Sequence, residues 1–161
     1  MHYLIDAYNL LFCFSKKQGK LEQKRQHLIE EINREALLLK LQITLVFDGA
    51  AVPPSLATRG HFDAVEIVYT PKNQTADQYI LQEVMQAPHP ARLTVVSNDR
   101  ELTGRCNLHK AHIKTLDAFL FFLMKKKKKK RREAKPPREF QISDGELKRL
   151  LKIFEERFLN E

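Results

Sequence analysis

The stretch Leu93-Thr-Val-Val-Ser-Asn-Asp-Arg-Glu-Leu102 decides the fold, because an apolar run ends in it abruptly in three polar residues. Its β-branched residues favour a buried strand, as found in parallel sheets that helices cover. The residues that follow this strand are Ser97, Asn98 and Asp99. Either they form a turn that caps the next helix, or they carry chemistry at the edge of the sheet.

Strand and helix patterns alternate along the first 124 residues. Apolar or β-branched runs predict strands over residues 2–5, 42–47, 64–69, 92–96 and 108–114. Apolar residues at helical spacing predict helices over about 20–40, 76–86 and 99–105, and from 117 into a lysine run. Alternating elements pair most economically in parallel through right-handed crossovers. We therefore predict an α/β fold with a mainly parallel central sheet and helices on both faces.

The rest of the chain has a different composition. Residues 125–142 begin with KKKKKKRR and include two prolines, so charge repulsion predicts an extended basic linker. Ser143 to Glu146 has capping-box spacing, and an apolar stripe predicts an amphipathic helix over residues 143–161. We divide the chain into a domain over 1–124, the linker and this helix. Three interpretations of the predicted helix stay open: docking on the domain, pairing of two copies of the chain, or binding of another protein.

Composition limits the class of protein. The formal net charge of +8 favours a polyanionic partner such as nucleic acid, although the eight consecutive cations of the lysine run account for all of it. Two cysteines without zinc-type spacing predict no disulfide framework and fit a reducing compartment. The apolar stretches are far shorter than the roughly 20 residues that span a bilayer. We expect a soluble, cytoplasmic protein.

Five aspartates fall where the predicted strands end. Asp6 follows the first strand, Asp48 the second and Asp99 the strand over 92–96. Asp77 and Asp117 lie in the first turns of helices that start near the same edge. Converging carboxylates repel each other unless a cation neutralises them. Magnesium or manganese suits oxygen-only ligands and can activate water for attack on a phosphodiester.

A structural role explains several of these acids equally well. A carboxylate at a helix N-terminus is stabilised by about 0.3–1 kcal/mol, which accounts for Asp77 and Asp117. Asp48 precedes a glycine and suits a turn, and Asp99 can cap the helix that follows it. Asp6 is different because it interrupts an apolar run and needs a partner or a function there.

Four motifs in this order resemble the NYN domain family, in particular its YacP-like branch within the PIN-like nuclease group. They are LIDAYNLL at 4–11, LVFDGA at 45–50, QTADQYI at 74–80 and VVSNDREL at 95–102. The resemblance covers roughly residues 1–124. It implies a compact α/β domain with a divalent-metal centre that cleaves RNA, often as an endonuclease.

The resemblance also implies roles for single residues. Asp6, Asp77 and Asp99 match the acids of the family motifs and are expected to hold Mg²⁺ or Mn²⁺. Asn9 matches the asparagine of the DxxN motif; it orients a carboxylate or a water, or makes a local turn hydrogen bond. The supporting positions are Asp48, Ser97 and Asp117.

Positive groups are expected to bind RNA beside the acids. The segment 58–62 is interpreted as a loop that contributes such groups, and the lysine run adds sequence-independent phosphate affinity or remains a solvated linker. The predicted RNA-binding residues are Arg59, His61, Lys72, Arg100, Lys125, Lys126, Lys127, Lys128, Lys129, Lys130, Arg131 and Arg132.

The first hypothesis is a metal-dependent endoribonuclease that hydrolyses RNA phosphodiester bonds in RNA processing or decay, with the ribosome as a candidate partner. The alternative is a non-catalytic RNA- or ribosome-binding module that uses the basic run. A third hypothesis is an interaction subunit that acts through the apolar stripe of residues 147–158. No membrane partner is expected.

Overall fold

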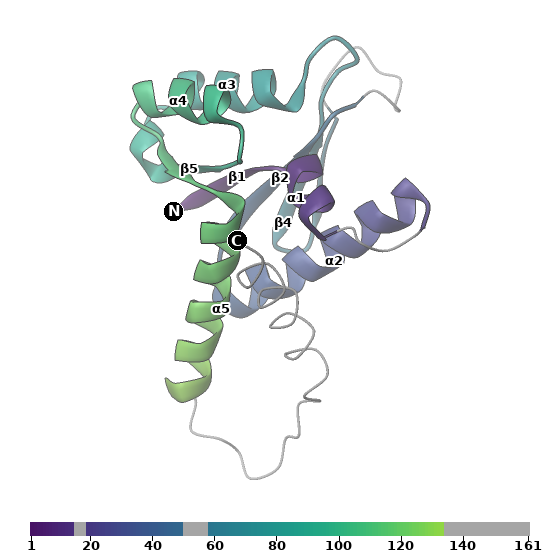
Figure 1. Ribbon diagram of the computed structural model, residues 1–161, viewed down its shortest axis with the longest axis vertical. Helices are drawn as coiled ribbons and strands as arrows, with labels where there is room; N and C mark the ends of the chain where they lie inside the picture. Colours follow the sequence, from purple (N-terminus) through teal and green to yellow (C-terminus); the bar gives the residue numbers. More distant parts are fainter. Residues whose placement is uncertain (15–18, 50–57, 134–161) are drawn as a thin grey trace, which may run out of the picture. The chain divides into compact units, whose positions relative to one another are not determined.

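The computed structural model describes residues 1–14, 19–49 and 58–133, and its central element is one six-stranded sheet (Figure 1). The strand order is β3-β4-β2-β1-β5-β6. All neighbouring strands pair in parallel except β3 and β4, which are antiparallel. The strands are β1 His2–Asp6, β2 Gln42–Phe47, β3 Thr58–Phe62, β4 Val65–Tyr69, β5 Leu93–Val96 and β6 His112–Lys114. The predicted α/β fold with a mainly parallel sheet is confirmed.

Helices cover both faces of the sheet (Figure 1). They are α1 Ala7–Phe14, α2 Leu21–Leu39, α3 Ala76–Gln86, α4 Arg100–Leu108 and α5 Leu116–Glu133, with a 3-10 turn, η1, at Pro90–Arg92. Leu4, Val46 and Val95 share a buried cluster with side chains of α3 and α4. On the other face, Tyr3 contacts Phe119 of α5 at 5.3 Å between ring centroids. Side chains alternate along a strand, so one strand supplies both cores.

Strands are added to the sheet on one side of β1 first and then on its other side. The strands β1, β2 and β4 follow one another outward on one side, whereas β5 and β6 are added on the other side of β1. Asp6 pairs with Val46, and Ile5 pairs with Val96 in the register. The end of β1 therefore lies between the ends of β2 and β5. In open α/β sheets such a switch point is where the functional crevice forms.

The lysine run is helical, so the prediction of an extended linker is wrong for residues 125–133. Lysine is a good helix former, and both prolines lie beyond the end of α5. Lys127 also pairs with Glu35 at 2.6 Å. Lys125 and Lys126 lie over the rings of Phe121 and Phe122 at 5.5 and 5.2 Å, respectively. These contacts to the helix stem and to α2 offset the repulsion between neighbouring cations.

Two other elements were not predicted. Helix α1 follows β1 directly, where the sequence suggested only a turn. The segment Thr58–Phe62 is an edge strand, β3, rather than a loop. All five of its residues are exposed, which removes the alternation of polar and apolar residues that identifies a strand.

The chain divides into two compact units, Met1–Lys129 and Lys130–Glu161. The predicted amphipathic helix over 143–161 lies outside the described residues. Within the described ranges, no helix combines the length and the apolar character that a membrane span requires.

Gly49 provides a test of the packing at the end of β2. A methyl group on Gly49 would lie 1.6 Å from the backbone oxygen of Thr70, whereas one on Gly104 in α4 would meet nothing within 4 Å. We expect Gly49→Ala to lower the free energy of unfolding by on the order of 3 kcal/mol. The matched Gly104→Ala should raise it by about 0.5–1 kcal/mol. Urea unfolding measures both values, and equal effects would contradict the packing.

Candidate active site at the carboxyl edge of the sheet

Asp6 lies where β1 passes directly into α1. Its side chain is 8 % exposed, and its carboxylate accepts hydrogen bonds from the backbone N–H of Asn9 at 3.2 Å and from Asn9 Nδ2 at 2.8 Å. The first of these bonds satisfies an amide group in the first turn of α1. Asp6 therefore has a capping role that the sequence did not suggest. Asp6 is thus the last residue of a buried strand and also caps the helix that follows.

Asn9 and Ser97 join the end of β1 to the end of β5. Asn9 Nδ2 lies 3.4 Å from Ser97 Oγ, and the same oxygen accepts from the backbone N–H of Asp99 at 3.1 Å. Ser97 is 1 % exposed. These two accepted hydrogen bonds use both lone pairs of the Ser97 hydroxyl. Its O–H group can still donate one hydrogen bond. The structure thus joins Asp6, Asn9, Ser97 and the backbone of Asp99 through hydrogen bonds.

The residues after β5 also start two helices. Asp99 Oδ1 accepts from the backbone N–H groups of Glu101 at 2.7 Å and Leu102 at 3.0 Å, so the predicted cap of α4 is present. Asn98 Oδ1 accepts from the N–H of Leu116 at 3.0 Å and holds the start of α5. The capping explanation of the polar residues that follow β5 is therefore confirmed, and capping leaves Asp99 Oδ2 outside these two bonds.

Asp48 and Asp77 meet at the start of α3. Asp48 Oδ1 accepts from the N–H of Ala76 at 2.7 Å, a contact across 28 residues that the sequence did not indicate. Thr75 caps the same helix in a capping box with Gln78. Asp77 lies in the first turn, and its Oδ1 is buried without a hydrogen-bond partner. A buried carboxylate oxygen without a partner is costly and needs an explanation.

Burial and mutual repulsion shape the electrostatics of the cluster. Burial raises the pKa of Asp77 to about 6, with further contributions from the charges of Asp6, Asp99 and Asp48 and from a hydrogen bond with Asp6. Burial also raises the pKa of Asp6, against the hydrogen bonds from Asn9 that lower it. Four carboxylates thus act on one another at the carboxyl edge. Such a cluster binds a cation more favourably than it binds another anion.

The donor set fits a hard divalent cation. Among the described residues, no group of three or more His, Cys, Asp or Glu side chains is placed to hold a metal ion. Magnesium, however, is commonly bound through one or two carboxylates and keeps several of its waters. The charge of Asp6 contributes to the raised pKa of Asp77, and Asp77 Oδ1 is buried without a hydrogen-bond partner. These two carboxylates are the best-suited ligands, with Asp99 as a nearby third charge.

The remaining predicted residues lie outside this cluster. Asp117 is exposed in the first turn of α5. Arg59 on β3 donates to Glu66 at 3.4 Å, to Glu83 at 2.6 Å and to the hydroxyl of Tyr79, so its guanidinium is engaged within the protein. The exposed cations near the carboxyl edge are Lys72, before α3, and Arg100, the first residue of α4; His61 is exposed on β3.

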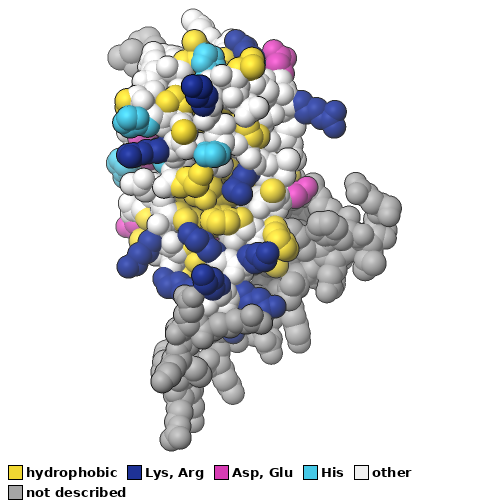
Figure 2. Space-filling view, turned by 90° about the vertical axis from the view of Figure 1, so that its left-hand side faces the viewer, with side chains coloured by type: hydrophobic (Ala, Val, Ile, Leu, Met, Phe, Trp, Pro, Cys, Tyr) yellow, Lys and Arg dark blue, Asp and Glu magenta, His cyan; other side chains and the backbone are white. Residues whose placement is uncertain are grey.

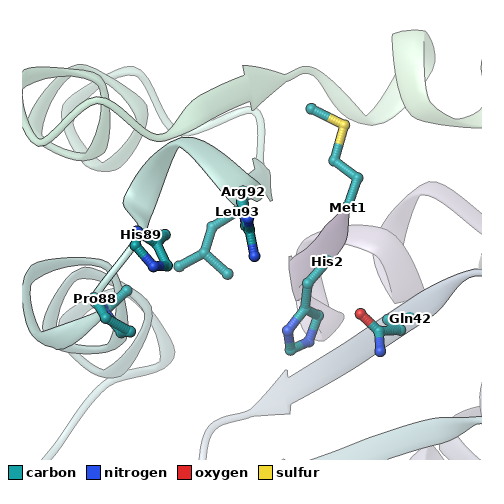
Figure 3. Close-up of a pocket in the computed structure, with 8 residues that line it drawn as sticks. Met1, His2, Gln42, Pro88, His89, Arg92 and Leu93 are labelled. Carbon is teal, nitrogen blue, oxygen red and sulfur yellow. The ribbon is translucent and has the colours of Figure 1, made fainter.

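A hollow of about 350 Å³ lies at the opposite edge of the sheet (Figure 3). Its lining includes Met1, His2 and Leu93, which begin or precede β1 and β5, and none of the clustered aspartates. The clustered aspartates are therefore separate from this hollow.

The sequence profile of the YacP-like NYN domain matches residues 3–156, so this chain belongs to that nuclease-like family. The match reaches beyond residue 124, where the resemblance was expected to end, and includes the lysine run.

Two solved structures share the fold. Rae1 (YacP) from Bacillus subtilis is 18 % identical over 98 % of this chain and 90 % of that chain, with a TM-score of 0.64. A mutant of the same protein is 20 % identical over 82 % and 80 % of the two chains, also with a TM-score of 0.64. Their similarity confirms the predicted PIN-like fold. Among curated proteins, none matches the sequence.

The raised pKa of Asp77 makes a prediction about stability. Because its pKa of about 6 exceeds the ordinary 3.8, the folded state binds the proton more tightly than the unfolded state. This contribution to stability is complete below about pH 4 and is lost as the pH rises through about 6. Asp77→Asn should therefore raise the melting temperature at pH 8 in EDTA and leave it unchanged at pH 4.

Asp117→Asn is the matched control, since it also removes a carboxylate from the first turn of a helix. It should not stabilise at pH 8, because a charge there interacts favourably with the helix dipole. A lower melting temperature for Asp77→Asn at pH 8 would show that the cluster does not strain the fold.

Proposed function

We propose that this protein is a divalent-metal-dependent endoribonuclease that hydrolyses phosphodiester bonds of RNA at the carboxyl edge of its sheet. The observation that carries this proposal is the mutual repulsion of Asp6, Asp48, Asp77 and Asp99, together with the unpartnered buried oxygen of Asp77. Membership of the YacP-like NYN family, which is nuclease-like, supports it independently.

The proposed ligands are Asp6 and Asp77, with Asp99 completing the site. Mg²⁺ or Mn²⁺ bound there would neutralise phosphate charge and lower the pKa of a water. Asn9 orients the Asp6 carboxylate, and both of its hydrogen bonds favour the charged form against the burial that raises the pKa of Asp6. Ser97 ties Asn9 to the backbone of Asp99 and so fixes the spacing between β1 and β5. Asp48 positions the start of α3, and with it Asp77.

Cations on either side of the acids would bind the RNA backbone. Lys72 and Arg100 are exposed near the acids. Helix α5 adds a dense group of positive side chains, and Figure 2 shows Lys and Arg gathered over the lower part of one face beside hydrophobic side chains. Lys114 and Lys126 lie over the ring of Phe122 at 5.3 and 5.2 Å. Such a surface favours polyanions without selecting a sequence.

A second candidate function is a non-catalytic RNA- or ribosome-binding module. The helical lysine run favours it, because a helix presents its charges at fixed spacing. The lack of three acids jointly placed for a metal, among the described residues, also favours it. Both candidates share an RNA ligand and a cytoplasmic location, and they differ in whether the RNA is cut.

Cleavage of a labelled RNA pool by the purified full chain separates the two candidates. We expect cleavage with Mg²⁺ or Mn²⁺, none with EDTA, and a loss of more than about 100-fold in Asp6→Asn, the upper end of what a supporting group at a metal site contributes. Asp63→Asn is the matched control, because Asp63 is an exposed aspartate in the turn between β3 and β4. Binding without metal-dependent cleavage would favour the second candidate.

The contribution of α5 is tested by the salt dependence of RNA binding. We expect Lys125→Gln/Lys128→Gln to reduce the slope of log K against log salt by about 0.7 per lost phosphate contact with single-stranded RNA. Lys127→Gln serves as a control, because Lys127 pairs with Glu35 inside the protein and its loss should mainly lower stability. If the double variant leaves the slope unchanged, these lysines do not contact RNA phosphates and their role is structural.

A further inference from the structure

Four aromatic rings form an array at the carboxyl edge of the sheet. Phe47 of β2 lies at its centre, with its ring centroid 5.5 Å from that of Tyr8 and 5.3 Å from that of Tyr69. Tyr8 in turn stacks with Phe12 one turn further along α1, at 6.3 Å and an interplanar angle of 29°. Phe47 is fully buried, so the three outer rings rest on a fixed base.

Arg25 of α2 completes the array. Its Nη1 donates to the Tyr8 hydroxyl at 3.4 Å, and its guanidinium lies 5.9 Å from the centroid of the Tyr69 ring. Arg25 and Tyr69 also line an open hollow of about 550 Å³ that continues along α2. The array therefore combines π surfaces, a cation and free space.

The array is joined directly to the acids. Tyr8 is two residues from Asp6, and its backbone hydrogen bond to that carboxylate lowers the pKa of Asp6. Phe47 immediately precedes Asp48, and Tyr69 precedes Thr70, whose Oγ1 accepts from the N–H of Gly49. A strand that crosses the carboxyl edge at the acids would reach these rings next.

Packing explains only the inner part of this array. Phe47 and the inner side of Tyr8 anchor α1 to the sheet, whereas Phe12 is 72 % exposed, among the most exposed large apolar side chains of the described residues. A single exposed apolar residue is ordinary on a protein surface. One that extends a stack of rings beside a cluster of acids has the arrangement of a stacking platform for nucleobases.

We propose that Tyr8, Phe12 and Tyr69, together with Arg25, form a subsite that stacks an unpaired nucleobase of single-stranded RNA beside the phosphodiester held at the acids. This inference rests on the proposed function. The hollow is also lined by Glu22 and Glu30, which repel phosphate, so the base and not the backbone is the part of the RNA that suits this place. Paired bases are stacked within a duplex and cannot occupy the subsite.

The test is binding of a short single-stranded RNA that contains 2-aminopurine, in EDTA so that no cleavage intervenes. Quenching of the 2-aminopurine fluorescence reports stacking, and anisotropy reports affinity. We expect Phe12→Ala and Phe12→Leu to abolish most of the quenching and to weaken affinity by about 5- to 100-fold, the range for one lost stacking contact. Leu108→Ala is the control, since Leu108 is an 82 % exposed apolar residue on α4.

The outcomes separate this inference from the proposed function. If both Phe12 variants bind and quench like the wild type, the subsite is overturned, whereas metal-dependent cleavage that needs Asp6 would leave the nuclease proposal standing. If Phe12→Ala weakens the binding of a fully paired duplex equally, the contact is not stacking and the inference also fails. If the wild type neither binds nor cleaves RNA, both are overturned. Tyr8→Phe should retain the quenching because it keeps the ring. Loss of the quenching in this variant would contradict the role of stacking.

Discussion

The parallel pairing of β1 with β2 on one side and β5 on the other is the constraint on which the rest of the structure depends. It places the carboxyl ends of three strands side by side, and each of these ends leads into an aspartate or a serine. The direction in which strands are added to the sheet changes at β1, and such a switch point is where open α/β sheets form their functional crevice. Acids that are far apart in the sequence are thereby held in one place although their charges repel.

The same acids also start the helices. Asp6, Asp48 and Asp99 each use an oxygen to satisfy backbone N–H groups at the beginning of α1, α3 and α4, respectively. This double use explains how the fold tolerates the cluster, since each of these carboxylates is partly neutralised by helix amides. Asp77 has no such partner at Oδ1, and it carries the raised pKa. The electrostatic repulsion is thus concentrated on Asp77, and a bound cation would relieve it most at this residue.

Helix α5 links the edge of the sheet to the lysine run. Asn98 holds its first turn beside the acids, and the helix continues without interruption through the lysines. At a rise of about 1.5 Å per residue, the first lysine lies roughly 14 Å along the axis from this turn. A rigid helix therefore places the positive charge at a set distance from the acids. The family match spans this helix.

The sequence by itself determined the order of strands and helices, the parallel sheet and the acids at the strand ends, because hydrophobic periodicity and capping residues are local signals. It did not reveal α1, which follows β1 directly, or β3, whose residues are all exposed. Nor did it reveal the helical lysine run, which α2 stabilises through Glu35. Only the tertiary structure decided that Asp48 holds α3, that Arg59 is bound by Glu83, and that four rings converge beside Asp6. Except for the stack of Tyr8 and Phe12, these contacts join residues distant in the chain, and their energies depend on burial and distance, which no local pattern encodes.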